Sequence, residues 1–152
     1  MIFGRKKKHE QVFGLSKAEM EPFQKGAVDP GPPPEEWIEL ETELTRHIER
    51  VASTPDAIVI LEEPNLGHYV QWMHQEGYVF SEASATLPEE KYELLLPLGW
   101  KPPFAAEQKH VPNWRQGWMP PFQAGSLARI AIHTLDTAYG IKPHDVRINQ
   151  VA

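Results

Sequence analysis

The sequence contains no cysteine among its 152 residues. This excludes disulfides, a cysteine nucleophile and cysteine-ligated zinc, and it fits the reducing cytoplasm, which is the expected location. Long apolar runs are also missing, since none approaches the roughly 18 residues of a transmembrane helix. The first residues, MIFGRKKKHEQVF, lack the apolar stretch of a signal peptide. We therefore expect a soluble protein that is not exported.

The common signatures of catalysis and nucleotide binding are absent as well. There is no Walker loop, dinucleotide fingerprint or HExxH pair, and Ser126 follows Gly125 without a Gly-x-Ser-x-Gly elbow. One alternative stays open, because a hairpin could bring His68, His74 and Glu82 together as a metal site or as the groups of a small enzyme. A solvated strand surface explains the same residues. The sequence thus favours a non-enzymatic protein without metal or cofactor.

Charge is unevenly distributed. Residues 1–34 hold 6 Lys+Arg and 4 Asp+Glu (+2), which leaves 9 and 17 (-8) for residues 35–152. An acidic body lacks the basic face that phosphate binding requires, so we expect no nucleic-acid partner. The only basic run, Arg5 to Lys8, could attach weakly to anionic lipid or be a solvated tail, and membrane contact is not expected beyond it.

Proline and periodicity divide the chain into an arm and a body. Residues 1–34 show no sustained periodicity and end in DPGPPP, a segment too poor in amide donors for helix or sheet. We predict a flexible, basic and proline-rich arm. Residues 35–152 are predicted to form a single α+β domain, which at this length can bury a sizeable core.

Three helices are predicted in the domain. Residues 35–52 place apolar side chains at spacings of three and four, which indicates an amphipathic helix; these are Trp37, Leu40, Leu44, Ile48 and Val51. A similar stripe begins at Leu127 and ends before Gly140. Between them, the capping box at Thr86 predicts a helix to about Leu96, stopped by Pro97 and Gly99.

The strands form a short series. Residues 57–61 are a continuous apolar run, and residues 69–75 and 78–85 flank Glu76-Gly77 as a hairpin. Residues 145–151 could add an edge strand, whereas residues 100–121 are predicted to be a long, proline-studded loop. The pattern predicts an α+β fold in which a small antiparallel sheet of three or more strands is packed by N- and C-terminal amphipathic helices.

Several motifs resemble a known family. YVQW, the small-residue strand SEASA, LPEE, LGWKPP, PNW and the terminal ARIAIHTLDTAYGI occur in this order over residues 37–148. Together they resemble the YbjN and type III secretion chaperone-like superfamily, in its actinobacterial peptide-binding chaperone branch. The resemblance implies a secretion-chaperone-like α+β fold, frequent homodimers and binding of a protein or peptide client rather than catalysis.

A chaperone of this kind needs exposed apolar area, and aromatic side chains supply it with few rotors to freeze. The candidate partner-binding residues are Tyr69, Trp72, Phe80, Trp100, Trp114 and Trp118. For the tryptophans the alternative is a place in the core or a role in stapling the loop. A competing hypothesis is a structural or regulatory protein tethered through its basic arm. Because Val12, Phe13 and Leu15 are apolar in a polar arm, the arm could also fold back as a mimic of a client.

Overall fold

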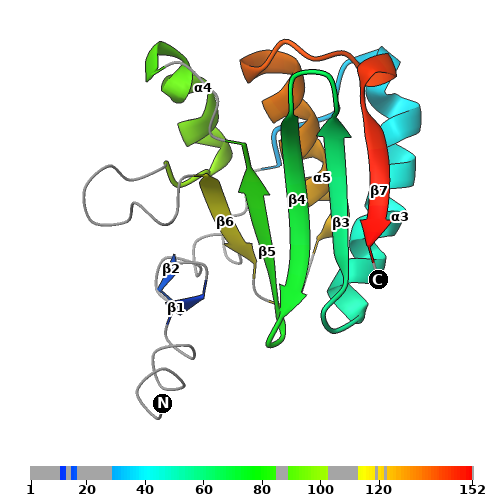
Figure 1. Cartoon of the computed structure of the whole chain (residues 1–152), viewed down its shortest axis with the longest axis vertical. Helices are drawn as coiled ribbons and strands as arrows, with labels where there is room; N and C mark the ends of the chain where they lie inside the picture. Colours follow the sequence, from blue (N-terminus) through cyan, green and yellow to red (C-terminus); the bar gives the residue numbers. More distant parts are fainter. Residues whose placement is uncertain are drawn as a thin grey trace.

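A five-stranded antiparallel sheet with helices on one face makes up the body of the protein (Figure 1). The computed structural model describes residues 11–12, 15–16, 29–84, 89–102, 113–118, 120–121 and 123–151. The sheet has the order β6-β5-β4-β3-β7. Its strands are β3 (Ile58–Glu63), β4 (His68–Gln75), β5 (Tyr78–Ala83), β6 (Trp114–Trp118) and β7 (Arg147–Val151). This confirms the predicted α+β class.

Strands β3, β4 and β5 form the predicted antiparallel meander. Gln75 pairs with Tyr78, so a two-residue turn joins β4 to β5. Both turn residues have positive φ, 53° at Glu76 and 84° at Gly77, the combination that type I′ hairpins require. The turn thereby fixes the register, and with it which side chains face the helices.

Helices α3 (Ile38–Ser53) and α5 (Ala124–His133) lie side by side behind the sheet (Figure 1). A 3₁₀ turn, Glu35–Trp37, precedes α3, and a π-helical turn, Thr134–Ala138, follows α5. The apolar stripes found in the sequence are the buried sides of both helices, which confirms the two amphipathic predictions. Gly140, at φ 67°, ends the second helix as predicted.

The third helix is shorter than predicted. A 3₁₀ turn (Glu89–Lys91), α4 (Tyr92–Leu95) and a second 3₁₀ turn (Leu96–Leu98) replace a regular helix. Pro97 lies inside the last turn and does not stop it, whereas Gly99, at φ 91°, does. The predicted cap at Thr86 lies outside the described residues.

The prediction of a loop over residues 100–121 is wrong, because β6 lies within it. β6 pairs with β5 from Val79–Trp118 to Ala83–Trp114. On its other side, Lys101 and Arg115 exchange two backbone hydrogen bonds of 2.9 and 3.1 Å. The predicted edge strand near the C-terminus is confirmed as β7, which pairs with β3.

A second, two-stranded sheet comes from the N-terminal part of the chain. β1 (Gln11–Val12) and β2 (Leu15–Ser16) pair antiparallel, and β2 lies beside β6 (Figure 1). The sequence shows too little periodicity there to predict strands.

Candidate functional site

The six aromatic residues predicted to bind a partner lie mainly in the interior. Trp72, Trp100, Trp114 and Trp118 are 0–3% exposed and belong to the core between sheet and helices. Phe80 is 1% exposed. Only Tyr69 is half-buried. A partner therefore meets five of these six side chains only if something that covers them moves.

Two of the interior tryptophans donate hydrogen bonds, and a third packs against another aromatic ring. The Nε1 of Trp100 donates to Thr134 Oγ1 at 2.9 Å, and that of Trp118 donates to Ser81 Oγ at 3.2 Å. The ring of Trp114 meets Tyr92 edge-on at 4.7 Å. Buried indoles favour such partners because the N–H loses water on burial. The contact of Trp114 thus joins β6 to α4, that of Trp100 reaches the π-helical turn, and that of Trp118 links β6 to β5.

The Leu98-Gly99-Trp100 motif has a structural explanation in these contacts. Gly99 takes the left-handed conformation that ends the helical turn. The Leu98 carbonyl accepts a hydrogen bond of 2.7 Å from Gln116 Nε2 in β6. The motif turns the chain so that Trp100 enters the core.

The accessible apolar side chains lie on the side of the sheet opposite to α3 and α5, which we call the outer face. Because side chains alternate along a strand, the buried Val59, Leu61, Val70 and Trp72 point toward the helices and their neighbours point outward. The outward apolar side chains on β3, β4 and the start of β5 are half-buried; they are Ile58, Ile60, Tyr69, Met73 and Tyr78. Three adjacent strands thus share a partly accessible apolar surface.

A polar cluster borders this surface at β5 and β6. Asn113 Nδ2 donates to the Tyr69 hydroxyl at 2.9 Å and to Glu82 Oε2 at 3.0 Å. Glu82 lies directly across from Arg115, which is 1% exposed. Burial and then the nearby Glu82 carboxylate raise the pKa of Tyr69, so the phenol stays neutral and able to donate at ordinary pH.

The histidines and glutamates considered as a reactive group do not come together. His74 Nδ1 contacts the Val51 carbonyl at 2.9 Å on the helix side of the sheet, and the His68 ring packs on Tyr139 at 4.7 Å. Glu82 points to the outer face. The two histidines therefore lie at opposite ends of β4 on the helix side, and Glu82 lies on the other face of the sheet. No group of three His, Asp or Glu side chains that could hold a metal exists among the residues described.

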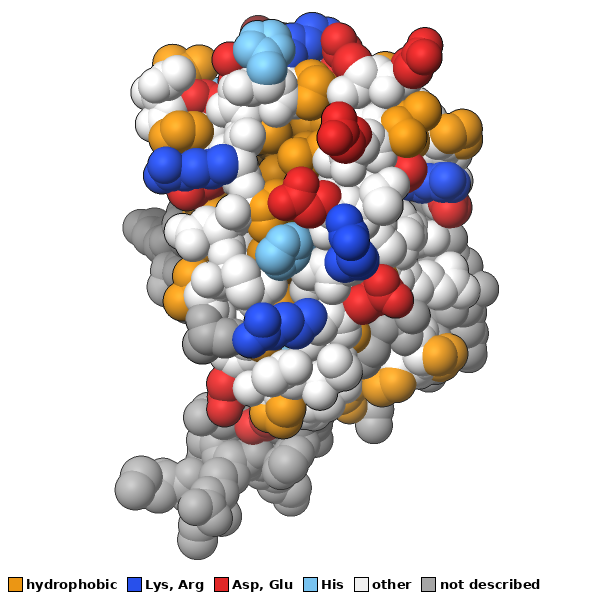
Figure 2. Space-filling view, turned by 90° about the vertical axis from the view of Figure 1, so that its right-hand side faces the viewer, with side chains coloured by type: hydrophobic (Ala, Val, Ile, Leu, Met, Phe, Trp, Pro, Cys, Tyr) orange, Lys and Arg blue, Asp and Glu red, His pale blue; other side chains and the backbone are white. Residues whose placement is uncertain are grey.

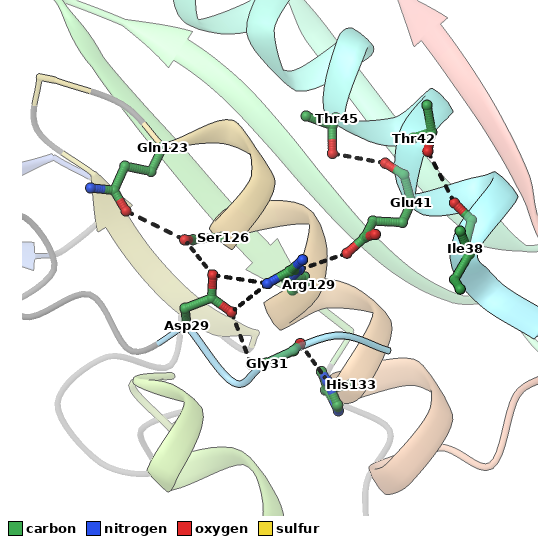
Figure 3. Close-up of polar contacts among 10 residues, drawn as sticks. All are labelled: Asp29, Gly31, Ile38, Glu41, Thr42, Thr45, Gln123, Ser126, Arg129 and His133. Atoms are coloured by element: carbon green, nitrogen blue, oxygen red, sulfur yellow. Dashed lines mark hydrogen bonds and ion pairs between the residues drawn. The ribbon is translucent and has the colours of Figure 1, made fainter. Parts of the chain in front are cut away.

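An open groove of about 540 Å³ lies between α3 and α5, on their solvent side. Arg129 crosses it, with Nε 2.7 Å from Glu41 Oε2 and Nη1 3.3 Å from Asp29 (Figure 3). Ser126 Oγ also donates to Asp29, at 3.2 Å. The Arg129 guanidinium is thus already paired with a carboxylate on each side of the groove.

These contacts fix the chain before α3, which the sequence assigns to a flexible arm. The Asp29 carboxylate accepts from the Gly31 amide at 2.8 Å, and His133 Nε2 lies 3.2 Å from the Gly31 carbonyl (Figure 3). Although partial burial acts to raise the pKa of Asp29, the Gly31 amide and Arg129 hold it below its usual value. The segment that begins at Asp29 therefore packs against α5. We call the contact of Asp29 with Arg129 and Ser126 the clasp. Nothing in the sequence pattern pairs residues so far apart.

The side formed by α3 and β7 carries a second hollow (Figure 2). Figure 2 shows an apolar strip there, flanked by charged side chains of both signs. Leu40 and Pro143 line a depression of about 330 Å³, with Glu36, Glu39, Glu43 and His144 around them. β7 is the edge of the sheet on this side. This side therefore offers an edge strand bordered by charged side chains of both signs.

The described helices include none that is both long and apolar enough to cross a membrane. The basic run from Arg5 to Lys8 lies outside the described residues, so tethering through it stays a prediction.

A family model described as "T3SS (YopN, CesT) and YbjN peptide-binding chaperone 3" (TY-Chap3) matches residues 32–151. The match spans helices α3, α4 and α5 and all five strands of the main sheet. Comparisons with curated proteins and with solved structures return no match.

Proposed function

Because the chain belongs to the TY-Chap3 family of peptide-binding chaperones, we propose that it is a non-enzymatic module that holds an extended, apolar segment of a client protein on the outer face of its sheet. The observation that carries the proposal is the partly accessible apolar surface on β3, β4 and β5. Family membership confirms the resemblance found in the sequence.

The geometry of the outer face suits an extended peptide. Ile58 and Ile60 are two residues apart on one strand, which separates them by about 7 Å. Side chains on one side of an extended peptide have the same spacing, so a peptide running along the strands places its apolar residues over this row. Because these side chains are only half-buried, a peptide can cover their remaining apolar surface without disturbing the core.

The proposal assigns different roles to the six predicted aromatic residues. Tyr69 contacts the client directly, and Phe80 does so where the end of the face is uncovered. The four tryptophans support the sheet from its helix side. They shape the binding surface without touching what binds to it.

A selection experiment tests this function. A phage-displayed library of random twelve-residue peptides is selected on the purified protein, and an enriched peptide is labelled with fluorescein. We expect enriched peptides with alternating apolar residues, because only one side of an extended peptide meets the sheet. Failure to enrich any sequence would contradict peptide binding.

Point variants then locate the binding surface. Met73→Glu places a charge in the middle of the outer face and is expected to weaken binding of the labelled peptide at least tenfold. Ile38→Glu is the matched control, since Ile38 is 49% exposed on α3 and is expected to leave the affinity unchanged. Equal losses in both variants, or a loss only in the control, would move the site away from the outer face.

The proposal retains two further features. The absence of cysteine supports a cytoplasmic location.

We also propose a homodimer joined through the β7 edges. Antiparallel pairing about Asn149 sets Arg147 of one copy opposite Val151 of the other and brings no like charges together. Light scattering would then report a dimer for the wild type and a monomer for Asn149→Glu, because the pairing sets residue 149 of the two copies opposite each other, where two carboxylates repel. A monomeric wild type would contradict the dimer.

A further inference from the structure

Burial changes across the outer face from one edge of the sheet to the other. At β7, Arg147, Asn149 and Val151 are exposed, and the outward side chains of β3 and β4 are half-buried. At β5 and β6, Phe80 and Arg115 are each 1% exposed. Yet the described helices α3 and α5 lie on the other side of the sheet (Figure 1). The β6 end of the outer face is therefore covered by something other than these helices.

The hairpin β1–β2 is in the right place to supply this cover. β2 lies beside β6 (Figure 1), and β1 pairs with β2 through Gln11–Ser16 and Val12–Leu15. The sequence QVFGLS is apolar at three of six positions, within an arm that is mostly polar. A short segment of this composition resembles the extended apolar client that the outer face is proposed to hold.

The clasp makes this placement possible at low entropic cost. It fixes the chain at Asp29 against α5, and twelve residues, 17–28, connect it to β2. Twelve residues span at most about 40 Å when extended, which is ample to cross a domain of this size. A tethered segment also acts at a high effective concentration, so weak contacts are enough to seat it.

We propose that β1–β2 is a built-in occupant of the β5–β6 end of the outer face, and that it competes with the client for that end. This inference rests on the proposed function and adds its regulation. When the hairpin is seated, the client meets only the half-buried row on β3 and β4. When it leaves, Phe80 and the neighbouring end of the face become available.

The expected effect follows from the population of the seated state. If the hairpin is seated in nine of ten molecules, the apparent Kd for a peptide that needs the whole face is about tenfold weaker than the intrinsic Kd. When the hairpin is removed from the outer face, the apparent Kd should therefore fall about tenfold, to the intrinsic value.

The test uses the full chain and the fluorescein-labelled peptide selected above. The double variant Val12→Asp/Leu15→Asp charges the hairpin, and Met20→Asp/Phe23→Asp makes the same change elsewhere in the arm as a control. We expect the apparent Kd to fall about tenfold in the hairpin variant and to stay at the wild-type value in the control. Amide exchange of residues 79–82 and 114–118 should accelerate in the hairpin variant alone, since their cover is lost.

The two ways of failing are distinguishable. If the peptide binds all three proteins equally, or if exchange in β5 and β6 is the same in all three, the hairpin is not the occupant and the inference is overturned while peptide binding stands. If no peptide binds any of the three, the proposed function fails, and the inference fails with it.

Discussion

Trp114→Ala is expected to lower the free energy of unfolding of the domain. It is not expected to remove a contact with a client. The Trp114 side chain is 0% exposed and packs on Tyr92. A buried tryptophan removes about 150–250 Å² from water, which at about 25 cal/mol per Å² amounts to about 4–6 kcal/mol. Partial collapse of the cavity brings the expected loss to about 3–5 kcal/mol.

Thermal unfolding followed by circular dichroism measures this loss. For a chain of about 150 residues, 1 kcal/mol shifts the Tm by about 2–4 °C, so Trp114→Ala should lower it by about 6–20 °C. Tyr69→Ala is the matched control, since its half-buried ring lies on the outer face, and its shift should be less than half as large. Trp114→Phe keeps most of the volume and provides a folded variant if alanine is not tolerated.

The same variants separate stability from binding. Trp114→Phe should bind the selected peptide with the wild-type Kd, because Trp114 does not reach the surface, whereas Tyr69→Ala should weaken binding. A Trp114→Ala protein as stable as the wild type, or a Trp114→Phe protein that folds but no longer binds, would refute the interior role of this ring.

Three further outcomes follow from individual contacts. Thr134→Val leaves the Trp100 N–H without its acceptor and should cost about 1–3 kcal/mol in urea unfolding; a cost near zero would contradict the contact. Gly77→Ala should cost about 1–2 kcal/mol because φ is 84° there. Gly125→Ala, in α5, should be neutral or stabilising by up to about 1 kcal/mol, because a Cβ added there meets no atom within 4 Å; equal effects of the two substitutions would contradict the turn geometry. The pKa of Asp29 is lowered from 3.8, so its carboxylate stabilises the clasp at pH values above 3.8, and this contribution is lost as the pH falls through the lowered pKa. The NMR shift of the Gly31 amide should therefore titrate below pH 3.8 in the wild type and not in Asp29→Asn. A wild-type shift that does not change with pH would contradict the clasp.

The helices and the central meander were predictable because their signals are local. The stripe from Trp37 to Val51 recurs at helical spacing and becomes the buried side of α3. Glu76-Gly77 has the composition of a tight turn and forms one. In both cases the residues that give the signal are neighbours in the final structure.

Strand β6 was missed because proline dominated the interpretation of residues 100–121. Trp114, Gln116 and Trp118 alternate with Arg115 and Gly117, which is the period of a strand. Weighing this alternation above the surrounding prolines would have predicted β6 and placed both rings on one side. The outer face then emerges as the accessible apolar surface, since the helices already cover the other.

The clasp and the position of β2 depend on contacts between distant parts of the chain. Asp29 and Arg129 are 100 positions apart, and no periodicity in one sequence connects them. The burial difference across the outer face likewise depends on how the sheet is assembled. Such features require the three-dimensional arrangement.

Hydrogen exchange of the full-length protein, with and without the selected peptide, tests the central claim most directly. The account predicts that the peptide slows amide exchange in β3, β4 and β5 and leaves the solvent side of α3 and α5 unchanged. Protection confined to the groove around Arg129, with no change in the sheet, would contradict binding on the outer face.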